Sequence, residues 1–254
     1  MIPYDDWLGT AQRLAVGMQV RVHHGRERTA AMTIANEHDR WWAYCQRCKT
    51  GGVKFKDHVA VGLKPPDRPS LELPTDMVGV SAEYIHVYRF LVNKGIDPCV
   101  ITEPIWYSAK ERRVLFKTPQ GWLGRDITGR SQQKWITYDQ QHYAGTVQNG
   151  IVIVTEDYLS ALKVKYVVPE HSVVSSLGTA VHSALAYELT KHATGVLVMY
   201  DGDKAGIGGS LKVWRQLRAL GLNVRPACAP QGKDPKDLTF AEIKERVQQC
   251  STFV

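Results

Sequence analysis

From residue 151 onward, short apolar runs alternate with longer segments whose apolar residues recur at helical spacing. Uninterrupted apolar runs are typical of strands buried on both faces, and amphipathic segments are typical of covering helices. This alternation predicts an α/β fold with a parallel sheet that helices cover on both faces. The expected strands are GIVIVTE (150–156), HSVVSSLG (171–178), GVLVMYDGD (195–203) and LNVRPACAP (222–230). The expected helices are DYLSALKV (157–164), TAVHSALAYELTKHA (179–193) and SLKVWRQLRALG (210–221).

Before residue 150 the pattern is less regular and predicts smaller parts. The stretch GLKPPDRPSLELPTD (62–76) places four prolines in a polar setting, which predicts a semi-rigid linker. Residues 82–95 have the spacing of an amphipathic helix that ends at a glycine, and residues 100–150 indicate short strands and turns. The expected division is a small module at 1–61, a linker at 62–80, an α+β subdomain at 81–150 and the α/β domain at 151–254.

Composition limits the classes of protein to consider. The hydrophobic fraction of 44% in 254 residues suits a globular protein, and no apolar run approaches the ~20 residues of a membrane span. The first residues, MIPYDDWLGT, carry two acids and no basic region, so a secretory signal is not expected. Five cysteines without such a signal indicate a reducing compartment, which is the cytoplasm, or the host cytoplasm for a bacteriophage protein. The net charge of +7 suggests a polyanionic partner, depending on where the basic residues lie.

Three acids follow expected strands of the α/β domain: Glu156, Asp201 and Asp203. The carboxyl ends of parallel strands meet at one edge of a sheet, so these side chains should converge there. A single acid at a strand end is more often a helix cap, but two aspartates at i and i+2 of an extended segment face one side. Carboxylate oxygens suit Mg²⁺, and Asp234 and Asp237 add two more after the fourth strand.

Metal ions held in this way favour phosphoryl chemistry. Two such ions can activate an attacking oxygen and stabilise a leaving group. Three glycines follow the aspartate pair and would permit a close approach of phosphate groups. They are Gly206, Gly208 and Gly209.

The order and spacing of VTEDYLSAL, SSLGTAVH, MYDGDKAG and GKDPKDL resemble the TOPRIM domain, and within that family the DNA primases of the bacterial and phage type. Upstream, YRFLVNKGID, RRVLFKTPQGWLGRDITGR and KWITY resemble the basic subdomain that precedes TOPRIM in primases. The resemblance implies a TOPRIM-type parallel sheet flanked by helices. It also implies a preceding α+β basic subdomain and an N-terminal zinc-ribbon-like β module.

The resemblance assigns catalysis and the binding of Mg²⁺ or Mn²⁺ to Glu156, Asp201 and Asp203, with Asp234 and Asp237 as further ligands. Two positions depart from the family pattern. Ser160 stands where primases usually have an aspartate, and Lys236 replaces an acid in the DPDE-like run. We therefore expect metal binding with a weakened affinity for one ion.

Basic residues are concentrated in residues 110–134, interleaved with or followed by Trp122 and Trp135. Scattered basic residues usually form a solvated face, but their position beside a metal site favours a groove for single-stranded template and nucleoside triphosphates. The candidate contacts are Arg112, Arg113, Arg125, Arg130, Lys134 and Lys204. By resemblance, Arg125 and Lys134 come first among them, and Arg113 follows.

The N-terminal module contains CQRCKTGG (45–52), whose two thiolates can share a Zn²⁺ ion. A lone CxxC is also compatible with redox chemistry or with no function. By resemblance, His24, Cys45 and Cys48 are the expected zinc ligands, with His23 or His38 as the fourth. The usual second cysteine is replaced by Arg21 or Val22, so a degenerate ribbon without metal is the alternative. The aromatic residues Trp41, Trp42 and Tyr44 are core residues or contacts to template bases.

The function implied by the resemblance is that of a DNA primase in DNA replication. This enzyme is a DNA-directed RNA polymerase, a nucleotidyltransferase that makes RNA primers on single-stranded DNA from ribonucleoside triphosphates. No P-loop pattern GxxxxGK[ST] occurs, so a replicative helicase would be a separate protein. The alternatives are a TOPRIM nuclease acting on DNA or RNA, and a catalytically degenerate primase-like DNA-binding protein. A topoisomerase would need a further large domain.

Overall fold

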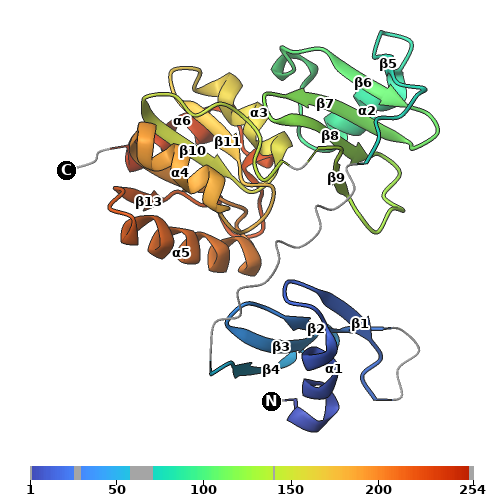
Figure 1. Ribbon diagram of the computed structural model, residues 1–254. Helices are drawn as coiled ribbons and strands as arrows, with labels where there is room; N and C mark the ends of the chain where they lie inside the picture. Colours follow the sequence, from blue (N-terminus) through green and yellow to red (C-terminus); the bar gives the residue numbers. More distant parts are fainter. Residues whose placement is uncertain (1, 26–29, 58–70, 140, 252–254) are drawn as a thin grey trace. The chain divides into compact units, whose positions relative to one another are not determined.

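A computed structural model describes residues 2–25, 30–57, 71–139 and 141–251 of the chain. The chain divides into two compact units, Met1–Pro69 and Ser70–Val254. The ribbon in Figure 1 shows the elements of each unit, which are described separately below.

The first unit is an antiparallel sheet, in the order β1-β2-β3-β4, with a short helix packed against it. Trp7 is 1% exposed and anchors the core between the helix and the sheet. A Cβ at Gly52 would lie 2.8 Å from Trp7 Nε1, so the glycine lets the indole pack on β4. The elements are a 3₁₀ turn (Tyr4–Asp6), α1 (Leu8–Arg13), β1 (Gln19–Val22), β2 (Met32–Asn36), β3 (Arg40–Cys45) and β4 (Thr50–Phe55).

The second unit begins with an antiparallel sheet in the order β5-β6-β7-β8-β9. Its core face packs against α2, from which Val87 and Leu91 are fully buried, and against Leu159 of α3. The elements are β5 (Val78–Gly79), α2 (Ile85–Asn93), a 3₁₀ turn (Pro98–Val100), β6 (Ile105–Ser108), β7 (Arg113–Thr118), β8 (Gly121–Asp126) and β9 (Trp135–Thr137). β5 lies inside the stretch 62–80 expected as a linker, of which 62–70 lie outside the described residues.

The second unit continues as a parallel sheet in the order β11-β10-β12-β13. Helices α4 and α5 cover one face, and α3 and α6 cover the other. The elements are β10 (Gly150–Thr155), α3 (Tyr158–Val167), β11 (Ser172–Ser175), α4 (Ser183–His192), β12 (Ala193–Met199), α5 (Lys204–Ala219), β13 (Val224–Pro226), a 3₁₀ turn (Pro235–Asp237) and α6 (Phe240–Cys250). The predicted α/β fold with a parallel sheet covered on both faces is confirmed.

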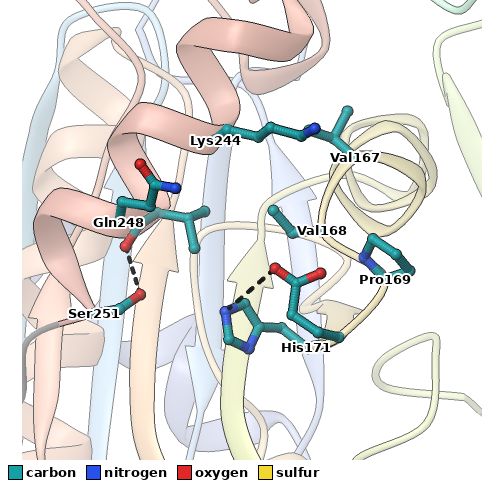
Figure 2. A pocket seen from close by; sticks show the side chains of 9 residues that line it. Val167, Val168, Pro169, His171, Lys244, Gln248 and Ser251 are labelled. Carbon is teal, nitrogen blue, oxygen red and sulfur yellow. Dashed lines mark hydrogen bonds and ion pairs between the residues drawn. The ribbon is translucent and has the colours of Figure 1, made fainter.

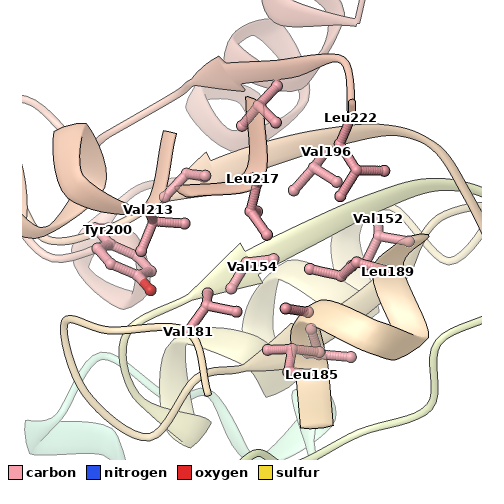
Figure 3. Packing of buried hydrophobic residues seen from close by; sticks show 14 residues of the cluster. Val152, Val154, Val181, Leu185, Leu189, Val196, Tyr200, Val213, Leu217 and Leu222 are labelled. Carbon is pink, nitrogen blue, oxygen red and sulfur yellow. The ribbon is translucent and has the colours of Figure 1, made fainter. Parts of the chain in front are cut away.

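Figure 3 shows the core on the α4 and α5 face of this sheet. Leu185 and Leu189 from α4, and Val213 and Leu217 from α5, pack on the valines of β10 and β12, and all are at most 1% exposed. Burying a side chain of this size stabilises the fold by about 1.5–3 kcal/mol. The sheet edge that follows β10 and β12 is therefore built on a rigid support.

The helix boundaries differ from the predicted ones at two places. α4 begins at Ser183 instead of residue 179, because the His182 side chain accepts a hydrogen bond from Ala184 N and caps the helix. α5 begins at Lys204 instead of residue 210, so the glycines after the aspartate pair are helical. Helix α6 was not expected from the sequence.

A hollow of about 700 Å³ lies between the end of α3 and α6 (Figure 2). His171 and Glu170 line it, with His171 Nε2 4.0 Å from Glu170 Oε1. Because these residues immediately precede β11, the hollow is at the amino edge of the parallel sheet. It is thus at the opposite edge from the acids described next.

No helix in the described part of the chain has the length and apolarity to cross a membrane.

Candidate metal and nucleic-acid site

Three carboxylates meet at the carboxyl edge of the parallel sheet. Asp157 follows β10, Asp201 follows β12 after one residue, and Asp234 lies in the loop after β13. One oxygen from each lies within 4.8 Å of the others, a spacing at which a cation can bridge them. Asp201 and Asp234 were predicted members of this site, whereas Asp157 was not.

Lys236 brings a positive charge among these carboxylates. Its Nζ lies 2.9 Å from Asp157 Oδ2 and also forms an ion pair with Asp234, and the side chain is only 11% exposed. Burial favours the neutral amine, but the two carboxylates outweigh it and raise the pKa of Lys236 above its usual value. The lysine that replaces a family acid is therefore a charged part of the site.

The carboxyl groups of Asp201 and Glu156 are the least satisfied in the site. Glu156 Oε2 and Asp201 Oδ1 are buried and have no hydrogen-bond partner among the residues that the structure describes. Burial, with Asp234 next, raises the pKa of Asp201 to about 8, and burial with the neighbouring Asp203 raises the pKa of Glu156. Unpaired buried carboxylate oxygens are costly, and a bound cation would satisfy them.

The other two predicted acids, Asp203 and Asp237, accept hydrogen bonds from nearby backbone N–H groups. Asp203 Oδ1 accepts a hydrogen bond of 2.7 Å from Gly206 N and caps α5. Asp237 Oδ2 accepts a hydrogen bond of 2.9 Å from Asp234 N. Asp203 still lies close enough to Glu156 to raise its pKa, so it belongs to the rim of the site.

Asp157 was not predicted as a site residue, since an acid directly after a strand is commonly only a helix cap, and Asp157 does cap α3. Ser160 N and Ser160 Oγ donate to its two oxygens at 3.0 and 3.2 Å. The serine at the usual family acid position thus orients an acid one helical turn earlier. The adjacent Glu156–Asp157 pair was the available signal.

The donor set fits Mg²⁺ or Mn²⁺. It consists of carboxylate oxygens, two of which are buried without partners, and hard oxygen donors are what these ions prefer. Within the described residues, the groups that could hold a metal are this acidic one and a His/Cys/Cys group in the first unit.

Arg113, one of the predicted nucleic-acid contacts, is buried at 7% exposure. Its two terminal nitrogens donate to Gly124 O, Lys134 O, Gln133 O and Ser131 Oγ at 2.9–3.3 Å. These bonds hold the loop before β9 against the sheet. The guanidinium is therefore committed to the fold.

Arg125 has a different environment. Its guanidinium lies 5.2 Å from the ring centroid of Trp135, and its buried Nε finds no hydrogen-bond partner in the described part of the chain. Burial lowers the pKa of Arg125, whereas Asp157 and Asp126 oppose that shift, so the side chain lies within electrostatic reach of the acidic site. Trp135 in turn packs edge-on against Tyr158, next to Asp157. Arg125 thus lies on the side of the antiparallel sheet that faces α3 and the acidic site.

The remaining basic candidates are exposed. Arg112 and Arg130 lie in the turns next to β7 and β8, Lys134 precedes β9, and Lys204 starts α5.

Two tryptophans lie on the sheet face away from α2. Trp122 packs edge-on against Trp106, with ring centroids 4.8 Å apart.

The first unit brings together the three zinc ligands expected from the sequence. One donor atom from each of His24, Cys45 and Cys48 lies within 4.8 Å of the others. The hydrogen bond from Thr50 is the main cause that lowers the pKa of the Cys48 thiol to about 7, with Cys45 and His24 contributing. Two thiolates and an imidazole fit Zn²⁺. Within the described residues this group includes neither His23 nor His38.

The family model described as Toprim-like matches residues 153–239, which carry Glu156, Asp157, Asp201 and Asp234. The Toprim-like domain therefore includes both the carboxylates and the lysine of the acidic site. The TOPRIM resemblance found from the sequence motifs is confirmed.

Curated relatives of the chain are DNA primases. It is 33% identical to the DNA primase of Clostridium acetobutylicum over 103 residues, which are 39% of this chain and 17% of that protein. It is 29% identical to the DNA primase of Salmonella typhimurium over 142 residues, 51% of this chain and 23% of that protein. The chain thus spans less than a quarter of the length of these relatives.

Solved primases share the fold. The zinc-binding and RNA polymerase domains of the Aquifex aeolicus primase match with a TM-score of 0.51 at 18% identity, covering 98% of this chain and 83% of that chain. A DnaG primase catalytic domain bound to single-stranded DNA matches with a TM-score of 0.52 at 17% identity, covering 67% of this chain and 73% of that chain. At these identities the matches establish the fold.

Proposed function

We propose that the protein synthesises short RNA primers on single-stranded DNA by metal-dependent nucleotidyl transfer. The observation that carries the proposal is the pair of buried, unpartnered oxygens on Glu156 and Asp201, at the Toprim-like edge that Arg125 also reaches. Such oxygens suit a divalent cation, and an unpaired guanidinium donor suits a phosphate. The primase names of the curated relatives supply the reaction class.

In the proposed reaction, Glu156, Asp201 and Asp203 would hold Mg²⁺ or Mn²⁺, and Asp234 would share its negative charge between that ion and Lys236. Such an ion would activate the attacking 3′-hydroxyl and neutralise charge on the α-phosphate. The Asp201 carboxyl would lose its proton to solvent on loading, because its buried oxygen would then have a cation as its partner. Arg125 would donate from its guanidinium to an oxygen of the incoming triphosphate.

The exposed basic residues Arg112, Arg130 and Lys134 contact template phosphates, and Lys204 contacts phosphates near the metal. Phosphate contacts supply sequence-independent affinity, while the rings of Trp106 and Trp122 can stack on unpaired bases. His24, Cys45 and Cys48 hold a structural Zn²⁺ in the module that selects the start site. We further propose that the protein acts in the cytoplasm together with a helicase on another chain.

Primer synthesis on mixed single-stranded DNA templates, with labelled ribonucleotides and Mg²⁺ or Mn²⁺, tests the proposal. Asp201→Asn and Asp203→Asn should abolish product while the variants remain folded. Glu245→Gln, an exposed carboxylate on α6, is the matched control and should retain wild-type yield.

The two alternatives give different results in the same assay. Metal-dependent cleavage of the template without RNA product would identify a nuclease. DNA binding without either reaction would identify a degenerate binding protein. Full product from Asp201→Asn would remove the metal assignment.

A further inference from the structure

We propose that Lys236 is a fixed cation that takes the place of one divalent ion, so that the acidic site loads a single Mg²⁺ or Mn²⁺. The inference rests on the metal site proposed above and specifies how many ions it holds. It concerns the residues of this chain and can be tested by ion binding alone.

The first observation is that the acids differ in their partners, although Asp157, Asp201 and Asp234 each place one oxygen within 4.8 Å of the others. Asp157 and Asp234 both pair with the Lys236 ammonium. Glu156 Oε2 and Asp201 Oδ1 have no hydrogen-bond partner among the described residues. The lysine thus already offsets one of the negative charges of Asp157 and Asp234, and the unpartnered oxygens remain for a cation from solution.

The second observation is that Asp157 is arranged as a counter-ion. One of its oxygens accepts from Ser160 N, and the other accepts from both Ser160 Oγ and Lys236 Nζ. A divalent ion at the position of the ammonium would need these oxygens as ligands. The two departures from the family pattern, at 160 and 236, therefore act together on the same carboxylate.

The third observation is that a second lysine, Lys163, holds the backbone of Lys236. Lys163 Nζ donates to Lys236 O at 2.6 Å and to Gly95 O at 3.0 Å. A Cβ at Gly95 would lie 2.6 Å from Lys236 O, so the glycine allows this approach. The ammonium is preorganised, and a fixed charge of this kind stabilises developing negative charge without reorganisation.

An ammonium has three N–H donors, and the two carboxylates account for two of them. Within the described residues the hydrogen bonds of this ammonium go to those two carboxylates, which leaves the third N–H for a phosphate oxygen, the contact a second metal ion would otherwise make. Lys236 thus supplies charge and one hydrogen bond in place of a divalent ion.

The test is the stoichiometry of Mn²⁺ binding to the full-length, zinc-loaded protein, measured by electron paramagnetic resonance of free Mn²⁺. Wild type should bind one Mn²⁺ at the acidic site. Lys236→Asp should bind a second, with an affinity raised about tenfold or more over any second site in wild type, because it exchanges a cation for a ligand. Lys236→Arg keeps the charge and should still bind one.

Lys233→Met is the matched control, since Lys233 lies in the same loop but pairs with Glu242 outside the site, and it should bind one Mn²⁺. The Lys236→Met variant provides a second test in case the aspartate variant does not fold. In thermal melts with and without Mn²⁺, it should gain more thermal stability from Mn²⁺ than wild type does. Two Mn²⁺ ions of equal affinity in wild type and in Lys236→Asp would overturn the inference. A single ion in a wild-type protein that makes no primers would leave it standing and contradict only the proposed function.

Discussion

Asp201 follows the buried end of β12 after one residue, in a position where its charge is poorly solvated. Burial is the main reason that its pKa rises to about 8, and the carboxylates of Asp234, Asp157 and Glu156 add to the rise. The folded protein without metal therefore keeps a proton on this group at neutral pH. A residue suited to binding a cation is in this way a source of instability when the cation is missing.

This gives a prediction for the protein without metal. The folded pKa of Asp201 is raised above its ordinary value of 3.8 to about 8, so between these values the folded state binds more protons and stability falls as pH rises. Asp201→Asn removes that loss and should melt at a higher temperature than wild type at pH 8 in EDTA. Each kcal/mol regained corresponds to about 2–4 °C in a unit of this size.

Thermal melts at pH 4 and pH 8, with EDTA or Mg²⁺, check this prediction. The two proteins should melt alike at the acid end, and Mg²⁺ should raise wild type more than the variant. Glu245→Gln should behave as wild type throughout. An Asp201→Asn protein no more stable than wild type at pH 8 without metal would contradict the electrostatic account.

The prediction that acids at the ends of parallel strands meet at one sheet edge placed Glu156 and Asp201 correctly, because it needs only the strand pattern. It did not identify Asp157 as a member of the site, and the assignment of Asp203 stays a prediction. Both residues cap helices, and the choice between capping and ligation depends on where their oxygens lie in three dimensions. Residue type and spacing do not fix that choice.

At the scale of elements, the pairing of β7 and β8 separates two arginines that look alike in the sequence. Arg113 lies opposite Asp126, and Arg125 lies opposite Val114. Paired residues share a face of the sheet and neighbours in a strand alternate, so the two guanidiniums are on opposite faces. Arg125 is on the face that packs against α2 and α3, toward the acids.

Replacing each of these two arginines with alanine should therefore have a different effect. Arg125→Ala should weaken binding of a single-stranded oligonucleotide or a triphosphate and reduce the salt slope by about 0.7 per lost phosphate contact, with little change in melting temperature. Arg113→Ala should cost about 1–3 kcal/mol of stability, since it leaves buried carbonyls without donors, and should bind normally when folded.

Fluorescence anisotropy over a salt series and thermal melts separate the two effects. Lys117→Ala, an exposed change on the same strand as Arg113, is the control for a general loss of positive charge. Wild-type affinity and salt slope in Arg125→Ala would place that residue outside the interface.

Alternating apolar runs were enough to predict the strands of the parallel sheet, because burial on both faces leaves a strong pattern. The start of α5 was harder, since a run containing Gly206, Gly208 and Gly209 has low helix propensity. Tertiary contacts override it: a Cβ at Gly206 would meet Asp201 O at 2.2 Å, and one at Gly209 would meet the Thr179 side chain at 2.7 Å. Those contacts are invisible in a single sequence.

At the scale of the whole molecule, the two units have separate cores of unequal size. The first rests on a small cluster around Trp7, Met32 and Ile34, whereas the second has large clusters on both faces of its parallel sheet. A unit of that size gains much of its stability from a bound metal. The proposed zinc site should therefore matter to the first unit alone.

Elemental analysis of the purified protein should find about one zinc per chain. Cys45→Ser should lose it and loosen residues 30–57, because a buried ligand is removed from a small core, while the second unit keeps its protection from hydrogen exchange. Cys99→Ser, an exposed cysteine of the second unit, is the control and should keep both metal and protection. A zinc-free wild type that is folded and active would contradict the site.

The hydrogen bonds of Lys163 have a consequence for how this protein can be divided and recombined. They tie the loop of Lys236 to the carbonyl of Gly95, which lies just beyond α2 and outside the Toprim-like segment 153–239. A graft of that segment alone would leave a buried ammonium short of an acceptor and the loop without its clamp. The smallest piece that an engineer could transplant with its site intact begins before α2, and positions 95, 163 and 236 should be inherited as a set.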